Sequence, residues 1–281
     1  MFVYGAKRIK MAKHYTSVVS NIFGKFASKA FPKAIQNFIN KGYVSLMGLD
    51  MSEFQDPSAY PTLNALFTRA FVKERTIGDD KTALISPADA LITDYGSIKE
   101  GKAYQIKGMS YDIDGLLGHH YKDKAAMLEG GDFINFYLSP KDYHRYHMPL
   151  DLKIKSLVHI PGKIYPVNMP LLRHKMNLFI ENERVVIECE DHHKKLHFLV
   201  LVGALNVGKM VVTFEEKVKT NANVYYTSHY TFSDLSLKKG EMFGWFEMGS
   251  TIVMLSEQNS IQTEVAINQK VSFGQKIGKI L

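Results

Sequence analysis

The chain has 281 residues, of which 46% are hydrophobic and 22% are charged, as in an ordinary globular protein. Cys189 is its only cysteine, which excludes an internal disulfide framework. No run reaches the ~18 consecutive apolar residues of a membrane-spanning helix. The first residues also lack the continuous apolar stretch of a secretory signal.

The net charge of +7 is concentrated at the N-terminus. Residues 1–49 contain eight basic side chains and no acidic ones, whereas residues 50–281 contain 27 basic and 28 acidic side chains. We therefore expect an anionic partner for the N-terminal segment. The nearly neutral remainder argues against a nucleic-acid groove through the main domain.

Residues 14–31 have the periodicity of an amphipathic helix, with Lys25 and Lys29 flanking its apolar stripe. Pro32 ends this helix, and we expect two further helices over 34–39 and 64–71. Two interpretations stay open: the stripe packs on its own domain, or it lies on an anionic membrane. The stripe consists of Val19, Ile22, Phe23, Phe26 and Ala30.

From about residue 80 the pattern changes to short β-like runs separated by Gly, Asp and Pro turns. We predict an α+β fold: a mainly antiparallel β domain over 63–281, preceded by a basic amphipathic helical segment over 1–62. The expected strands are 83–86, 90–98, 102–108, 132–139, 152–160, 184–190, 197–205, 209–216, 250–255 and 263–268.

The segment SPKDYHRYHMP (139–149) is the densest candidate for chemistry, because His144 and His147 stand three residues apart in it. Histidine serves as a general acid, a general base or a metal ligand. The alternative is that both rings are simply hydrogen-bonded at a strand end. A second group, His192, His193 and His197, is expected in a solvated hairpin tip, because no Cys, Asp or Glu accompanies it at a ligand spacing.

A third candidate combines distant residues. Ser250 lies in a Gly-Ser-Thr sequence that usually marks a tight turn, and Asp89 lies in a Ser-Pro-x-Asp turn where it would bond local backbone donors. Alternatively, Asp89, His147 and Ser250 form an acid–base–nucleophile chain. Residue types alone decide for neither interpretation, since any chain of this length contains an Asp, a His and a Ser.

From about residue 60 onward the chain contains, in this order, the segments YPTLNALFTRAF, SPADALITDYG, QIKGMSYDIDGLLG, FYLSPKDYHRYHMP, HIPGKIYPVN, NLFIENERVV, VGALNVG and KKGEMFGWFEMGST. This ordered series resembles bacterial phosphatidylserine decarboxylases. Two positions depart from the family pattern: Ala90 stands where Gly is usual, so the turn after Asp89 must avoid positive φ, and Met248 stands where Leu is common.

The resemblance implies a proenzyme that cuts itself between Gly249 and Ser250. Ser250 Oγ would attack the Gly249 carbonyl, with His147, oriented by Asp89, as the base. A 249-residue β chain and a 32-residue α chain would result, forming a heterodimer that dimerises further. Ser250 would become a covalent pyruvoyl cofactor, and no metal is implied.

The same resemblance implies a lyase activity. The pyruvoyl group would form a Schiff base with phosphatidylserine, and loss of CO₂ would give phosphatidylethanolamine, with His144 transferring a proton. We then expect a peripheral protein on the cytoplasmic side of a bacterial inner membrane, because each basic residue near the surface contributes about 1 kcal/mol of attraction to anionic lipid. The expected membrane contacts are Ile22, Phe23, Lys25, Phe26 and Lys29.

Three alternatives remain. A serine esterase or peptidase using the same three residues would stay one intact chain. A non-catalytic membrane-binding module would bind lipid without cleavage. Residues 264–280 resemble a lipoyl- or biotinyl-domain hairpin, but no well-placed acceptor lysine accompanies them, so we interpret them as strand architecture only.

Overall fold

The computed structural model describes residues 24–104, 110–165, 177–204, 209–221, 226–247 and 250–281. The expected helix over 14–31 lies mostly outside these ranges, as do Ile22, Phe23, Met248 and Gly249. Its described part is helical over 24–27 and turns at Ser28, so the helix ends before the expected residue 31.

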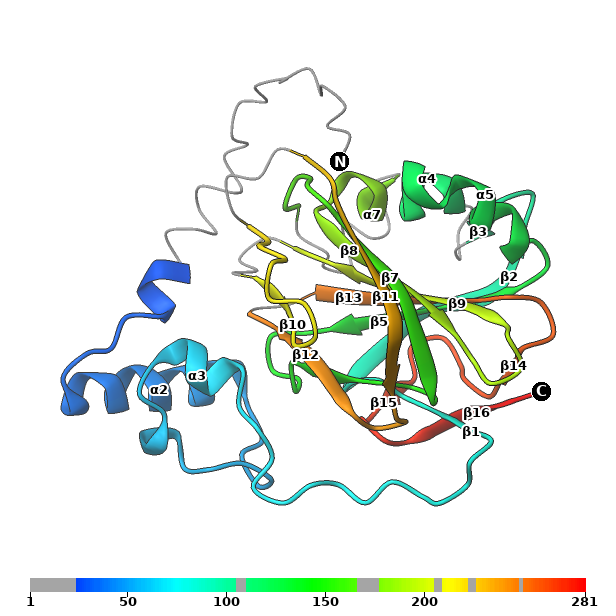
Figure 1. The fold of residues 1–281 in the computed structure, drawn as a ribbon. Helices are drawn as coiled ribbons and strands as arrows, with labels where there is room; N and C mark the ends of the chain where they lie inside the picture. Colours follow the sequence, from blue (N-terminus) through cyan, green and yellow to red (C-terminus); the bar gives the residue numbers. More distant parts are fainter. Residues whose placement is uncertain (1–23, 105–109, 166–176, 205–208, 222–225, 248–249) are drawn as a thin grey trace.

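The N-terminal helices form a small lobe beside the β domain (Figure 1). Its elements are α2 (Lys33–Met47), the 3₁₀ turn η1 (Pro57–Ala59) and α3 (Leu63–Phe67). The helix expected over 34–39 is much longer, because no proline interrupts it and a single internal glycine, Gly42, is tolerated. It ends where Gly48 takes the left-handed conformation (φ 62°).

Buried amides hold this lobe together. Asn40 Nδ2 donates to the carbonyls of Pro57 and Tyr60, each at 2.9 Å, and Asn40 Oδ1 accepts from Gln36 at 2.8 Å. The apolar residues Ala27, Tyr60, Leu63 and Leu66 pack beside them. As a result α3, which the expected boundary at 62/63 assigns to the β domain, packs against α2. The helix α3 ends at Phe67, earlier than the expected residue 71. The next residue, Thr68, donates its hydroxyl to the Asn64 carbonyl.

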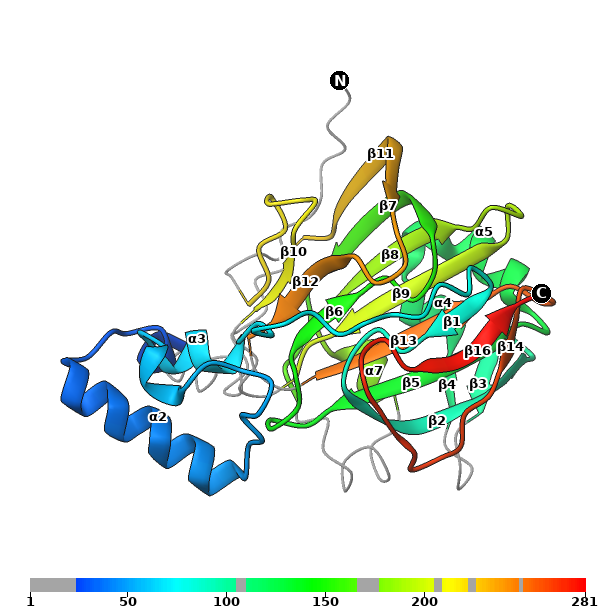
Figure 2. The ribbon, with the colours of Figure 1, turned by 90° about the horizontal axis from the view of Figure 1, so that it is seen from below.

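The β domain is built on one large antiparallel sheet (Figures 1 and 2). Its strand order is β11-β7-β8-β9-β13-β5-β2-β3-β4, and β15 pairs with β2. In chain order these strands are β2 (Ala90–Lys99), β3 (Lys102–Tyr104), β4 (Ser110–Asp112), β5 (Asp132–Leu138), β7 (Leu152–Ile160), β8 (Arg184–Glu190), β9 (Leu196–Val202), β11 (Ser228–Leu237), β13 (Ser250–Ser256) and β15 (Lys270–Val271).

Two three-stranded sheets complete the domain. One has the order β1-β16-β14 and the other β10-β12-β6. The second sheet matters for the site, because it holds the histidine segment against the segment that precedes Ser250. The strands are β1 (Ala83–Ile85), β6 (Arg145–His147), β10 (Met210–Val212), β12 (Met242–Phe246), β14 (Ile261–Thr263) and β16 (Lys276–Ile280).

Apolar clusters cover both faces of the large sheet, so every residue of β9 and β13 is buried. On one face the cover consists of short helices, whose Leu116, Tyr121 and Phe179 join the cluster around Phe198. The predicted α+β class, a mainly antiparallel β domain with an N-terminal helical segment, is confirmed. The covering elements are α4 (Ile113–Leu117), η3 (His119–Tyr121), α5 (Lys122–Ala125), η4 (Ala126–Leu128) and α7 (Leu178–Glu181).

Several strands differ from expectation. The ten-residue β11 was not predicted, because it is an edge strand in which only its last residue, Leu237, is buried. The run 263–268 is a strand only at its first residue, the end of β14, and 209–216 is a strand only over 210–212. Apolar residues in these two runs can be buried without belonging to a strand. Val265, for example, lies on irregular backbone and packs in the main apolar cluster.

His192 and His193 lie exposed at the β8–β9 tip, as expected, but His197 does not. It is buried in β9, where its ring nitrogens contact Ser256 Oγ (3.0 Å) and Asp191 Oδ2 (3.3 Å). Among the described residues no group of three His, Cys, Asp or Glu side chains is placed to hold a metal ion. Within the same ranges, no helix is long and apolar enough to cross a membrane.

Candidate active site

Ser250 is the first residue of β13, a strand in the interior of the large sheet. Its Cα pairs with Leu138 on β5, and the next residue, Thr251, also pairs with Val202 on β9. Ser250 is fully buried, and its Oγ has no hydrogen-bond partner in the described part of the chain. The Gly-Ser-Thr sequence is therefore more than a solvated turn, because a buried hydroxyl normally finds a partner.

Leu138, opposite Ser250, leads directly into the histidine segment. Asp142 Oδ2 accepts from both the backbone N and the Oγ of Ser139 at 2.7 Å, and the Asp142 N–H donates to the Ser139 carbonyl at 2.9 Å. With Pro140 as its second residue, this is a favoured tight turn. The turn leads into β6, which ends at His147 and pairs with β12, while the His144 carbonyl accepts from the backbone N–H of Phe246 at 2.9 Å.

His144 is fully buried, with its ring 4.0 Å from that of Phe67 on α3. Its Nδ1 lies 2.8 Å from the Asp142 carbonyl, which can only accept, so Nδ1 carries the proton and Nε2 the lone pair. Burial lowers the pKa of His144 to about 3, so the ring is neutral at pH 7. Nε2 has no partner among the described residues.

His147 is neutral for the same reason: burial lowers its pKa to about 4. Its Nδ1 donates to the Gly240 carbonyl at 2.8 Å, and its Nε2 accepts from the hydroxyl of Tyr143 at 3.0 Å. Gly240 has φ +82°, and a Cβ there would stand 2.1 Å from Ile77 Cδ1. The turn that supplies this carbonyl therefore requires glycine.

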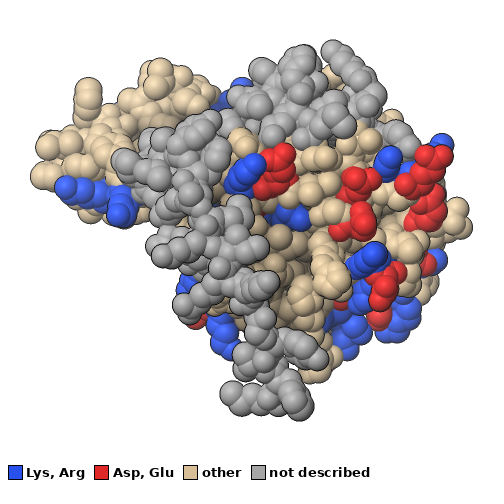
Figure 3. All heavy atoms as spheres, turned by 90° about the horizontal axis from the view of Figure 1, so that it is seen from above, with Lys and Arg blue, Asp and Glu red and all other residues tan. Residues whose placement is uncertain are grey.

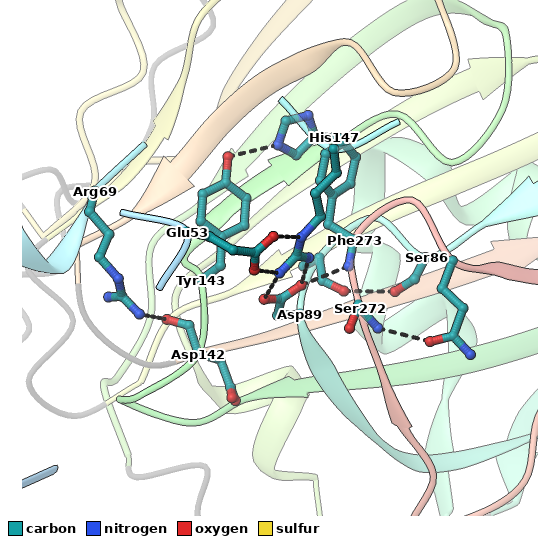
Figure 4. Close-up of polar contacts among 12 residues, drawn as sticks. Glu53, Arg69, Ser86, Asp89, Asp142, Tyr143, His147, Ser272 and Phe273 are labelled. Carbon is teal, nitrogen blue, oxygen red and sulfur yellow. Dashed lines mark hydrogen bonds and ion pairs between the residues drawn. The ribbon is translucent and has the colours of Figure 1, made fainter. Parts of the chain in front are cut away.

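Asp89 lies beside His147 but is bonded elsewhere (Figure 4). Its carboxylate accepts from Arg75 Nη1 (2.5 Å) and Nη2 (3.1 Å), and Oδ1 also accepts from the backbone N of Phe273 (2.7 Å). The Phe273 ring stacks on the His147 imidazole, with centroids 3.6 Å apart and an interplanar angle of 19°.

Since both His147 nitrogens are bonded to Tyr143 and Gly240, the direct Asp89–His147 hydrogen bond of a triad is not formed within the described residues. Instead, Phe273 contacts both groups: its backbone N–H donates to the Asp89 carboxylate, and its ring stacks on the His147 imidazole. Ala90 begins β2 and is not among the residues with positive φ, as its departure from the family pattern requires.

The structure adds residues that the sequence analysis did not single out. Arg75 is fixed between Asp89 and Glu53, and Tyr143 stacks on Phe71 with centroids 4.1 Å apart. Arg69, two residues after the end of α3, is a buried cation that donates to the Lys141 carbonyl on the loop before His144. The visible signal for Arg69 was its place in the segment YPTLNALFTRAF, which carries part of the family resemblance. Nothing local to the sequence indicates that Phe273 contacts His147.

The expected membrane contacts that the structure describes, Lys25, Phe26 and Lys29, are all exposed. Lys33 and Lys41 on α2 are exposed as well. Seen from above, the helical lobe shows basic side chains without acidic ones, whereas both signs are interspersed over the β domain (Figure 3). The structure thus leaves a basic surface on the lobe available to an anionic partner.

Two buried neutral histidines lie on or next to β6, which pairs with β12 just before a buried serine whose hydroxyl has no partner in the described part of the chain, and such a set of residues is typical of an enzyme site. Comparison with known proteins gives the family. A sequence model of phosphatidylserine decarboxylase matches residues 63–279. The chain is also 41% identical to the phosphatidylserine decarboxylase proenzyme of Campylobacter jejuni over 262 residues, covering 92% of this chain and 97% of the relative.

Other relatives agree. The proenzyme of Helicobacter pylori strain Shi470 is 41% identical over 265 residues (94% of this chain, 97% of the relative), and that of Marinobacter nauticus is 35% identical over 268 residues (93% of each). This chain therefore belongs to the phosphatidylserine decarboxylase family.

Proposed function

We propose that the chain is a pyruvoyl-dependent phosphatidylserine decarboxylase that cuts itself between Gly249 and Ser250. The observation that supports this most directly is the state of Ser250, fully buried at the start of a central strand with an unbonded Oγ. The relatives are named as proenzymes, which is consistent with a precursor that must be processed.

The self-cleavage moves one acyl group and then breaks one C–O bond. Ser250 Oγ attacks the Gly249 carbonyl carbon, the C–N bond breaks, and an ester replaces the peptide bond while the hydroxyl proton passes to the serine nitrogen. Removal of the serine α-proton then expels the Gly249 carboxylate from Cβ. Water converts the resulting dehydroalanine to a pyruvoyl group and ammonia. Each proton removal needs a neutral base, and both buried histidines are neutral.

The residues around Ser250 fit such a group. Position 250 is fully buried and paired with Leu138 on β5, and the next residue, Thr251, lies between β5 and β9, so a carbonyl there would be fixed and shielded from water. When present, a pyruvoyl carbonyl supplies the electron sink for the carbanion left by CO₂. His147, stacked on Phe273 and bonded to Tyr143, would act in processing. His144, with its free Nε2 lone pair, would carry a proton to or from the substrate Cα.

The membrane is the proposed partner of the helical lobe. α2 leaves three large apolar side chains exposed, Ile35, Phe38 (80%) and Leu46 (83%), and at 100° per residue they share one face. Exposed apolar residues on α2 and exposed lysines at positions 25 and 29 give the lobe the composition of an interfacial helical segment. It would place the protein peripherally on the cytoplasmic side of a bacterial inner membrane, close to its lipid substrate.

The test is an intact-mass spectrum followed by an activity assay. We expect two chains, 1–249 and 250–281, the smaller lighter than its serine-started form by one ammonia, and conversion of phosphatidylserine to phosphatidylethanolamine. The Ser250→Ala variant should remain one chain. A wild-type protein that stays intact and is labelled at Ser250 by a fluorophosphonate would instead be a hydrolase, and the proposal would fail.

A further inference from the structure

Arg69 is a buried cation with no carboxylate partner in the described part of the chain. Only 2% of the residue is exposed. Its Nη2 donates to the Lys141 carbonyl at 2.9 Å, with the Asp142 carbonyl at 3.4 Å, and its guanidinium lies 4.4 Å from the centroid of the Phe54 ring. Nε and Nη1 are buried and find no acceptor among the described residues.

Two other arginines of this chain show that the arrangement is unusual. The buried Arg184 donates from Nε, Nη1 and Nη2 to four backbone carbonyls, and the partly buried Arg75 is paired with two carboxylates. Leaving a buried donor without a hydrogen-bond partner destabilises the folded state by about 1–3 kcal/mol, and by more if the donor is charged. Buried charges are therefore normally paired. The free edge of Arg69 is thus suited to an anion that the described part of the chain does not supply.

Arg69 lies against the loop of the candidate active site that leads to His144. Lys141, whose carbonyl Arg69 holds, lies on the loop between Leu138, which faces Ser250, and His144. Phe67, two residues before Arg69, contacts the His144 ring (Figure 4 shows Arg69 beside this loop). Arg145 Nε in turn donates to the Thr68 carbonyl at 3.0 Å and fixes this segment. Two unsatisfied groups therefore flank one loop: the Arg69 guanidinium and His144 Nε2.

We propose that Arg69 is the anion-binding residue of the substrate site and that its Nε and Nη1 take the phosphodiester of the lipid headgroup. The inference rests on the proposed decarboxylase function. A guanidinium fork matches two oxygens of a phosphate group. The headgroup carries a second anion, the carboxylate, but that group leaves as CO₂. Holding it by a strong ion pair would stabilise the ground state against the reaction, whereas the phosphodiester keeps its charge throughout.

Binding at Arg69 also has a consequence for His144. Burial is the main cause that lowers the pKa of His144, and the positive charge of Arg69 lowers it further. A bound phosphodiester neutralises that charge, so the histidine accepts a proton more readily once substrate is in place. Substrate binding and proton transfer are thereby coupled on one loop.

The experiment compares wild type, Arg69→Gln and Arg69→Lys, with Lys195→Gln as a matched control that breaks a partly buried ion pair far from Ser250. Processing is followed by intact mass, and decarboxylation of a short-chain phosphatidylserine gives kcat and KM. A short-chain phosphatidylmethanol, which has the phosphodiester but neither amine nor carboxylate, serves as a competitive inhibitor. Free serine, which has the amine and carboxylate without phosphate, serves as the second inhibitor.

We expect Arg69→Gln to cleave itself, to raise KM roughly 10- to 100-fold with kcat little changed, and to weaken phosphatidylmethanol by the same factor. Arg69→Lys should recover part of the affinity, and inhibition by serine should not change. Unchanged KM, or weaker serine with unchanged phosphatidylmethanol, overturns the assignment. If Arg69→Gln fails to process, Arg69→Lys carries the same comparison. A wild type that binds phosphatidylmethanol through Arg69 but makes no phosphatidylethanolamine would refute the proposed function and leave the anion site standing.

Discussion

The ring of Phe273 lies on the imidazole of His147, with centroids 3.6 Å apart, while the Phe273 backbone N–H donates to Asp89 at 2.7 Å. Phe273, near the C-terminus, thus contacts both Asp89 and His147. Gly249–Ser250 cleavage would leave Phe273 on the short α chain, so the β chain's His147 would depend on the α chain for its orientation.

Replacing Phe273 with Leu should slow self-cleavage. The backbone bond to Asp89 stays, but the imidazole loses its stacking surface, and a misplaced base costs on the order of tenfold or more in rate. The rate of appearance of the 32-residue chain is the measurement. Phe198→Leu, a buried aromatic residue at the other end of the sheet, controls for lost packing. Equal slowing in both variants would show that stacking on His147 is irrelevant.

Arg75 should matter only through Asp89. Arg75→Gln leaves the Asp89 carboxylate without its bidentate partner, so we expect slower processing, as for Asp89→Asn. The double variant should be no slower than Asp89→Asn alone, because the two changes remove one interaction. Cleavage rates of the four proteins decide the point. Multiplicative losses would mean that Arg75 has an independent role.

The stability of the uncut protein should depend on pH between about 4 and 6.5. His147 has its pKa lowered to about 4 by burial, so the unfolded chain binds a proton there that the folded chain does not. The stability is complete above pH 6.5 and falls as the pH drops toward 4, by roughly 3 kcal/mol for His147. His144, at about 3, adds a loss in the same direction.

Urea unfolding of Ser250→Ala at several pH values measures this loss without interference from cleavage. His192→Asn, a change in the exposed tip, should leave the pH dependence as it is. A free energy of unfolding that is flat from pH 6.5 to 4.5 would mean that the histidines are already solvated in the folded protein.

Charge on the helical lobe should control membrane binding. Reversing Lys25 and Lys29 to Glu should weaken binding to vesicles of anionic phospholipid roughly tenfold or more, since each lysine contributes about 1 kcal/mol. Vesicle co-sedimentation at two salt concentrations measures it, because the attraction is screened by salt. Lys122→Glu with Lys194→Glu reverses two exposed lysines of the β domain as the control. Equal binding by all three proteins would exclude the lobe as the membrane contact.

Much of the architecture was readable from the sequence because it depends on local pattern. Alternating and continuous apolar runs predicted β5, β7, β8, β9 and β13, since a strand buried on both faces must be apolar throughout. The same logic missed β11, an edge strand that buries little, and underestimated α2, which is fixed by the buried amides Gln36 and Asn40 rather than by an apolar stripe.

For the site, the sequence by itself supplied the candidate residues Ser250, His144, His147 and Asp89, and it indicated the family, which the comparisons confirm. Only the tertiary structure decided their relationships. In the structure Ser250 pairs with Leu138, and His147 is hydrogen-bonded to Tyr143 and Gly240. Asp89 is bonded to Arg75, and the ring of Phe273 stacks on the His147 imidazole. The reason is physical: composition and period report burial, whereas hydrogen-bond partners are set by strand register and turn geometry between segments far apart in the chain.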